Sequence, residues 1–133
     1  YAENATHTDF PKYNKNQLEM YRAIVEATKQ AVRTAGVDIV IPSGTAIQNG
    51  RTTNIGDNFT KGGYHLNSIG MYTIACTWFE KLFGRDVRKN SYMPASIDKS
   101  SADVARTAAH FAIKEPYKVT VLGEFLKSPE NNN

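Results

Sequence analysis

Hydrophobic residues recur at helical spacing along three stretches of the chain. In each stretch the apolar side chains lie three or four positions apart, so they line one side of a helix. A residue that stops helices follows each stretch closely. The stretches are Asn16 to Ala35, Ile69 to Phe83 and Lys99 to Ile113, and they are followed by Gly36, Gly84 and Pro116. The pattern therefore predicts three amphipathic helices.

A different pattern follows the first helix. The run Val37 to Ile41 is β-branched apart from Asp38, and Pro42 closes it, which is typical of a buried parallel strand. Tyr117 to Leu122 is a weaker candidate for a final strand. Because a helix followed at once by a strand is typical of α/β proteins, we expect an α/β fold in which the second helix packs against the strand.

The number of predicted strands is low for such a fold. A parallel sheet covered on both faces needs several strands, and this sequence offers one clear strand beside three helices. Two interpretations remain open: a mostly helical fold with a minimal sheet, or the C-terminal part of a larger α/β protein. The 133 residues are accordingly a single domain or a fragment of a larger one. The polar stretch Ser128 to Asn133 is expected to be a frayed tail.

The segment from Ser43 to Asn67 lacks helical periodicity and is rich in Gly, Thr, Asn and Asp. Loops of this length usually carry function or are disordered, and scattered apolar residues such as Ile47 and Phe59 favour an ordered loop. Ligands of open α/β sheets bind beyond the carboxyl ends of the strands. We therefore expect the functional site in the segment that follows Ile41.

Composition and charge narrow the class of protein. Hydrophobic residues make up 41% of the chain and charged residues 22%, as in ordinary globular domains. No apolar run approaches the roughly 20 residues of a membrane helix, so we expect no membrane span. The net charge is only +3, and the basic residues alternate with acids instead of forming a stripe. Nucleic acid is therefore not an expected partner.

The cysteine and two of the three histidines point to no cofactor. Cys76 is the only cysteine, which excludes an internal disulfide, and its place in an apolar helical pattern predicts a buried structural thiol. His7 and His110 lie far from His65 in the sequence, and the three histidines show no H-x3-H or His/Cys spacing for zinc, so we expect no metal site. His110 lies in the alanine-rich helix and is expected to be solvated or capped.

The third histidine has the clearest functional setting. His65 stands at the end of the sequence Gly62-Gly63-Tyr64-His65, just before the second predicted helix, where the chain would display its imidazole. Histidine titrates near neutral pH, so a displayed imidazole can act as a general base. The alternative is a loop histidine whose nitrogens are satisfied by backbone groups.

Three pieces of this region together resemble the C-terminal region of SGNH (GDSL-type) hydrolases, and most closely an uncharacterised branch of that superfamily. They are the stretch Ile41 to Thr52, Ile55-Gly56-Asp57 and Gly62 to Leu66. The resemblance covers roughly residues 10 to 120. It implies a flavodoxin-like three-layer α/β/α fold and a serine nucleophile. It also implies a closing Asp-x-x-His block whose histidine is the base, and that histidine falls on His65.

The sequence departs from the family pattern in two places. Gly62 stands where the family has the aspartate that orients the histidine, although Asp57 or a backbone carbonyl could take over that role. The blocks that carry the nucleophilic serine and the oxyanion donors have no counterpart here. Ser43 is no substitute, because it follows a proline and lacks the Gly-x-Ser-x-Gly form of a nucleophile elbow.

The leading functional hypothesis is therefore a serine esterase or acetylesterase whose histidine base is His65. Asn49, Arg51 and Asp57 are candidate substrate-binding residues, although a solvated turn around Asn49 is an equal interpretation. The expected partners are an acylated small molecule or carbohydrate, and a missing N-terminal half or second chain that supplies the serine. The resemblance also implies a periplasmic or secreted protein.

Two other classes of function stay open. A noncatalytic relative, acting as a binding or structural module, would explain both the glycine at position 62 and the missing serine block. An α-rich structural domain with an accidental likeness is the third possibility. We expect the chain by itself to lack esterase activity, since it holds at most the base of the catalytic machinery.

Overall fold

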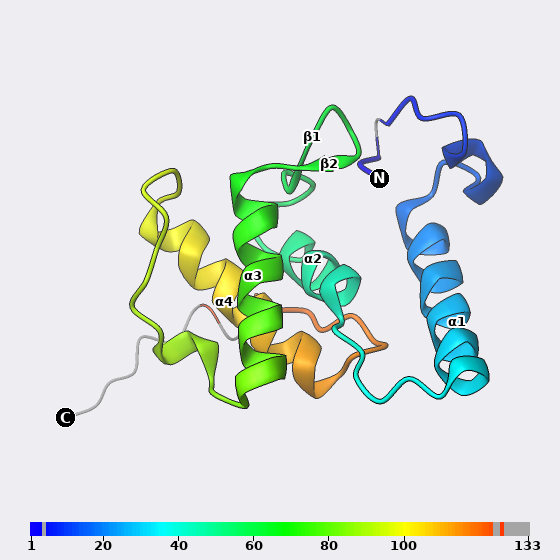
Figure 1. The fold of residues 1–133 in the computed structure, drawn as a ribbon. Helices are drawn as coiled ribbons and strands as arrows, with labels where there is room; N and C mark the ends of the chain where they lie inside the picture. Colours follow the sequence, from blue (N-terminus) through cyan, green and yellow to red (C-terminus); the bar gives the residue numbers. More distant parts are fainter. Residues whose placement is uncertain (4, 124–125, 127–133) are drawn as a thin grey trace.

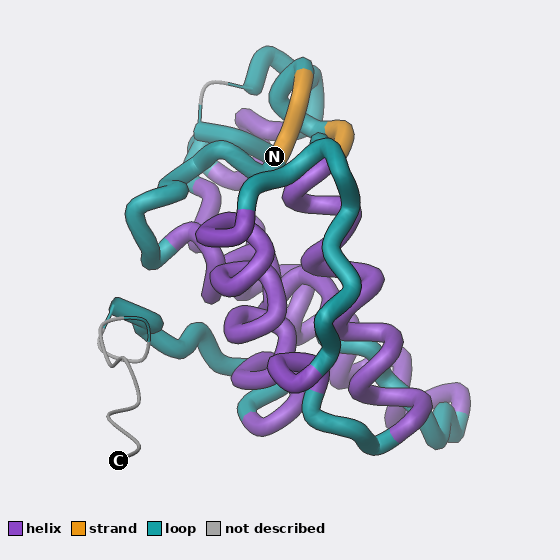
Figure 2. The backbone as a smooth tube through the Cα atoms, turned by 90° about the vertical axis from the view of Figure 1, so that its left-hand side faces the viewer, coloured by secondary structure: helices purple, strands orange, loops and turns teal. Residues whose placement is uncertain are grey.

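The computed structural model describes residues 1–3, 5–123 and 126, and most of them form helices (Figure 1). The elements in chain order are η1 (Phe10–Tyr13), α1 (Gln17–Ala35), α2 (Ser43–Arg51), β1 (Thr60–Lys61), β2 (His65–Leu66), α3 (Ser68–Phe83), η2 (Val87–Lys89) and α4 (Lys99–Lys114). Figure 2 shows both strands at one end of the helices. The chain thus combines helices with a two-stranded antiparallel sheet, which confirms the α/β class in its broad sense.

The three predicted helices are confirmed as α1, α3 and α4, and local sequence sets their ends. The side-chain oxygen of Asn16 accepts hydrogen bonds from the N–H groups of Leu18 and Glu19, both at 3.0 Å. This satisfies two of the free amides at the start of α1. Gly36 ends the helix with φ of 63°, a left-handed conformation that glycine adopts readily.

Helices α2, α3 and α4 pack into one body (Figure 1). Helix α4 presents small residues to the interior, and Ala102, Ala105, Ala108, Ala109 and Ala112 are all fully buried. Tyr72 and Cys76 of α3 pack in the same core as three of these alanines. The predictions that the alanine face is core and that Cys76 is buried are therefore confirmed.

Phe59 fixes how α2 and α3 meet at the base of the hairpin. Its side chain is fully buried. A Cβ atom on Gly50 of α2 would collide with the Phe59 ring, and one on Gly70 of α3 would collide with the Phe59 carbonyl oxygen. Two helices can approach this residue only because both contact positions lack a side chain.

Helix α1 lies to one side of this body (Figure 1). Its Met20 packs with Ala5 and Phe10 of the N-terminal segment, in a hydrophobic cluster separate from those of the body. A polar contact joins it to α2, where the hydroxyls of Tyr21 and Thr45 lie 2.9 Å apart. No helix in the described part of the chain is long and apolar enough to cross a membrane.

The predicted strand Val37 to Ile41 is wrong for this chain, because these residues form no strand in the structure. The expected packing of α3 against that strand is therefore also absent. A strand needs a neighbour to pair its backbone groups, and the described residues place none beside this run. The weaker prediction at Tyr117 to Leu122 is wrong as well.

The end of the described chain is held by side chains instead. The N–H of Thr120 donates to Asn49 Oδ1 at 2.7 Å, and the N–H of Leu122 donates to Thr52 Oγ1 at 3.0 Å. The backbone here is thus held by side-chain oxygens and not by the backbone hydrogen bonds of a neighbouring strand. The predicted tail Ser128 to Asn133 lies outside the described residues.

The long predicted loop contains a helix and the hairpin. Residues Ser43–Arg51 form α2, in which every residue from Thr45 to Gly50 is buried. Gly44 and Gly50 lower the intrinsic helix propensity of this stretch by about 1 kcal/mol each relative to alanine, which conceals it from a pattern analysis. Ser43 is accordingly the first residue of a helix, not the start of a loop.

Candidate functional site

His65 lies on a short antiparallel hairpin directly before α3. Strand β1 pairs with β2 so that Lys61 lies opposite His65. Gly62 and Gly63 form the turn with φ values of 61° and 81°, which side chains rarely allow. Asn67 then caps α3 by accepting a hydrogen bond from Gly70. The hairpin therefore presents His65 at the start of a fixed helix.

The imidazole of His65 is exposed, and its ring lies 4.4 Å from the ring of Tyr64. Tyr64 is itself 49% exposed and meets His7 edge to face at 5.4 Å. His7 stacks on Tyr1 at 4.7 Å. Within the described residues, no hydrogen bond or ion pair reaches the nitrogens of His65, so they are open to a ligand.

The structure shows no carboxylate orienting this imidazole within its described residues. Gly62 has open space where a Cβ would stand. Both oxygens of Asp57 are engaged elsewhere. Oδ1 accepts a hydrogen bond from Gln17 Nε2, and Oδ2 accepts one from the N–H of Glu3, each at 2.8 Å. Asp57 therefore does not serve His65 in this conformation.

Arg51 completes the same network around Asp57. Its Nε lies 3.0 Å from Asp57 Oδ1, an ion pair whose angle does not make a hydrogen bond. Its Nη2 donates to the carbonyl of Tyr1 at 3.2 Å. Burial lowers the pKa of the Arg51 guanidinium, and the charge of Asp57 opposes that shift. The pair thus ties the N-terminal segment to α2.

Asn49 is fully buried between α4 and the end of the described chain. Its Nδ2 donates to the Ala108 carbonyl at 3.2 Å, and its Oδ1 accepts from the N–H of Thr120. A substrate could reach this amide only by breaking both bonds. Of the sequence-predicted site residues, the structure brings Arg51 and Asp57 together and leaves His65 and Asn49 apart from that pair.

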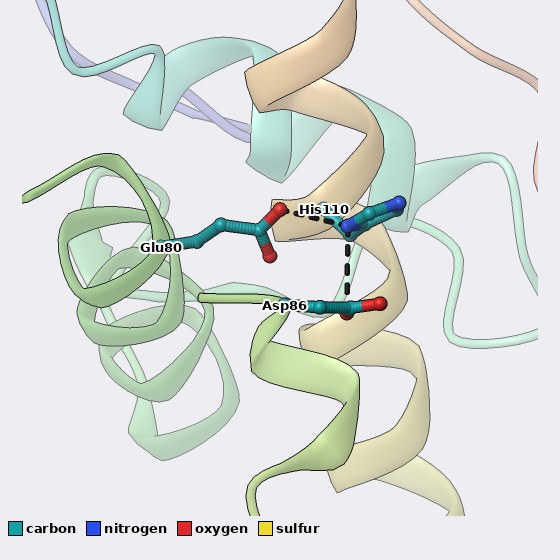
Figure 3. A group of neighbouring side chains, drawn as sticks. All are labelled: Glu80, Asp86 and His110. Atoms are coloured by element: carbon teal, nitrogen blue, oxygen red, sulfur yellow. Dashed lines mark hydrogen bonds and ion pairs between the residues drawn. The ribbon is translucent and has the colours of Figure 1, made fainter. Parts of the chain in front are cut away.

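The structure also contains a cluster that sequence reasoning missed, made of Glu80, Asp86 and His110 (Figure 3). His110 Nδ1 donates to Glu80 Oε1 at 2.7 Å and lies 3.5 Å from Asp86 Oδ1. The expectation that His110 is solvated is wrong, because its side chain is only 7% exposed. Glu80 and Asp86 stand 30 and 24 positions before His110 in the chain, so no local sequence motif predicts these contacts.

One ligand atom from each of these three residues lies within 4.8 Å of the other two, close enough for a single cation. The two carboxylates of the cluster nevertheless already have partners within the protein. Arg88 donates from Nε and Nη2 to Asp86, and the N–H of Val87 donates to Glu80 Oε2 at 2.9 Å. Those hydrogen bonds from Arg88 lower the pKa of Asp86. Because Asp86 is already paired with the Arg88 guanidinium and Glu80 with His110 and a backbone amide, the arrangement is that of a partly buried cluster of ion pairs and hydrogen bonds.

The geometry thus defines a helical domain that displays one histidine on a hairpin. The chain belongs to the DUF4886 family, a domain of unknown function, whose family model matches residues 1–112. No curated protein sequence matches it. It is similar to the crystal structure of a DUF4886 family protein from Bacteroides uniformis, with a TM-score of 0.90 and 53% identity. The match covers 92% of this chain and 48% of that one, so this chain spans about half of its relative's length.

Proposed function

We propose that this chain supplies the general base of an SGNH-type ester hydrolase, and that His65 is that base. The placement of His65 is the observation that carries the proposal. Its imidazole is exposed on a hairpin, directly before a capped helix, with no polar partner among the described residues. A general base must come within hydrogen-bond reach of the proton that it takes, and an open imidazole on a fixed element meets that need.

We also propose an arrangement of layers for the complete domain. We expect a three-layer α/β/α arrangement in which α1 and the body of α2, α3 and α4 cover opposite faces of a central sheet. The position of α1 to one side of the body supports this (Figure 1). The sheet and the serine would come from the part of the longer relative that this chain does not cover.

In the proposed reaction the serine attacks the ester carbonyl while His65 takes the proton from its hydroxyl. The imidazolium then gives that proton to the departing alcohol, which leaves an acyl-serine. In the second half, His65 takes a proton from water, and the hydroxide attacks the acyl carbon. The serine oxygen recovers the proton and the acid is released. The expected substrates are acylated small molecules or carbohydrates.

A noncatalytic module is the second candidate, and one observation favours it. His65 has no carboxylate at position 62, and the oxygens of Asp57 are already bonded. An aspartate that orients the base contributes substantially to the rate in hydrolases of this kind. The same observation predicts that a hydrolase of this design is slow and that Gly62→Asp accelerates it. Aspartate tolerates the left-handed φ of 61° better than most residues do.

The test uses a joined protein, in which the uncovered half of the Bacteroides uniformis relative is fused to this chain in the order of that relative. We expect the joined protein to hydrolyse p-nitrophenyl acetate. His65→Ala should lower kcat/KM by about 10²-fold to 10⁴-fold. His7→Ala is the matched control, because His7 lies in the same aromatic cluster, and it should retain activity. Equal turnover by the His65→Ala protein and the parent would refute the proposal.

A further inference from the structure

A groove separates α1 from α2, and apolar residues line it. One hollow of about 310 Å³ lies between Ile24 of α1, Ile47 of α2 and Tyr64 of the hairpin. A second hollow, of about 160 Å³, continues past Ile24 to Val40 and Ile41. Tyr21, Ile24, Ser43 and Gly44 line both hollows, so they form one continuous groove, called here the α1–α2 groove.

The segment Val37 to Ile41 reaches this groove through Val40 and Ile41, and its other apolar side chains are left exposed by the described residues. Val37 is 45% exposed and Ile39 is 56% exposed, while Ile24 across the groove is 49% exposed. Monomeric proteins rarely leave a contiguous apolar surface of this kind in water. The groove and the segment therefore have the character of an interface whose other side is not among the described residues.

The backbone of the segment is also unpaired. No described residue accepts a hydrogen bond from the N–H groups of residues 38 to 41, and none donates to the carbonyls of residues 37 to 40. The nearest backbone bonds lie at its ends, from the N–H of Val37 to the Val32 carbonyl and from Ser43 to the Ile41 carbonyl. Free N–H and C=O groups along a β-branched run form a template for strand pairing.

We infer that Val37 to Ile41 is a strand position, completed when an extended apolar strand pairs with it and places side chains in the α1–α2 groove. The occupant is a strand from the part of the family's longer protein that this chain does not cover. The Bacteroides uniformis relative supports this choice, since it shares the geometry at a TM-score of 0.90 and contains about as much chain again. The pairing does not depend on whether the joined protein hydrolyses esters.

Hydrogen exchange followed by NMR tests the inference. In the isolated chain, the amides of residues 38 to 41 should exchange at rates near those of an unstructured peptide. In the joined protein defined above, at least alternate amides of this run should slow by about 100-fold or more, because one neighbouring strand pairs every second N–H. Slow exchange of all four amides would also support the inference, and would indicate that neighbouring strands pair with both edges of the segment.

Two substitutions show whether the apolar contact drives the pairing. Ile39→Lys should leave the melting temperature of the isolated chain unchanged, because Ile39 is exposed there. It should lower the Tm of the joined protein by about 5 °C or more and restore fast exchange. Val121→Lys is the matched control, since Val121 is likewise exposed, at 68%, but lies outside the segment Val37 to Ile41. Fast exchange of residues 38 to 41 in the joined protein, or an equal effect of both substitutions, would overturn the inference.

Discussion

At the scale of single residues, Glu80 makes the most consequential polar contacts in the body. One of its oxygens accepts from His110 and the other from the N–H of Val87, so it joins α3, η2 and α4. Glu80→Ala would leave the buried amide of Val87 without its partner and would leave the His110 imidazole with only Asp86, at 3.5 Å. We predict a loss of about 3 kcal/mol in the free energy of unfolding, measured in urea. Glu26→Ala, on the exposed side of α1, should change it by less than about 0.5 kcal/mol.

The stability that the same cluster contributes should depend on pH through Asp86. Hydrogen bonds from Arg88 lower its pKa below the unfolded value of about 3.9. A carboxylate with a depressed folded pKa stabilises the protein above the unfolded value, and that contribution is lost as the pH falls through the folded pKa. Asp86→Asn should therefore cost about 1 kcal/mol at pH 7. The difference from the parent should shrink on acidification below pH 4, and a difference that stays constant would contradict this account.

The thiol of Cys76 should react only slowly in the folded protein. Burial raises the pKa of its thiol to about 11, and a hydrogen bond with Tyr72 opposes the shift only in part. Thiolate is the reactive form, so little of it exists at pH 8, and the side chain is only 3% exposed. Ellman's reagent should label the native protein slowly and the urea-unfolded protein at once. Rapid stoichiometric labelling of the native protein would show that the α3–α4 core opens readily.

At the scale of elements, the two glycines around Phe59 decide how closely α2 and α3 can approach. Gly70→Ala adds a methyl group where the Phe59 carbonyl already stands. Alanine favours a helix over glycine by about 1 kcal/mol, but overpacking at this contact should outweigh that gain and leave a net loss of about 1–3 kcal/mol. Gly44→Ala is the matched control in α2, because nothing lies within 4 Å of its added Cβ. It should stabilise the protein or leave it unchanged, as chemical denaturation would show.

Local sequence predicts some of these elements and not others. The caps at Asn16 and Gly36 act within a few residues, so pattern and capping predict α1 well. Helix α2 depends on the burial of Thr45 to Gly50 against Phe59 and α4, which overrides the low propensity of its glycines. The strand Val37 to Ile41 has the right side chains, but strand formation requires a neighbour elsewhere in the chain or outside it.

The candidate site shows the same limit. The display of His65 follows from a short local signal, two glycines and a following helix, and the structure places it on an exposed hairpin. The buried state of His110 depends on Glu80 and Asp86, which folding brings together from distant positions. Asn49 looked like a turn residue in the sequence, and the fold instead uses it to hold Thr120. Contacts between distant positions are what the sequence could not predict.

At the scale of the whole molecule, the chain contains a packed body and a less supported helix α1. Apolar residues line the α1–α2 groove between them, and the segment Val37 to Ile41 reaches it at Val40 and Ile41. If a further part of the family fold fills the groove, joining it should raise stability as well as order the strand. The joined protein should then show one cooperative thermal transition, recorded by circular dichroism, above that of the isolated chain. Two separate transitions would indicate that the parts do not share an interface.

The central claim, that His65 acts as a general base, is tested most directly by the rate of serine labelling in the joined protein. A fluorophosphonate probe reacts with an activated serine and requires no knowledge of the natural substrate. We predict that one serine is labelled, and that His65→Ala slows the labelling about 10²-fold or more while His7→Ala leaves it unchanged. Labelling of the His65→Ala protein at the parent's rate, or no labelled serine at all, would contradict the account.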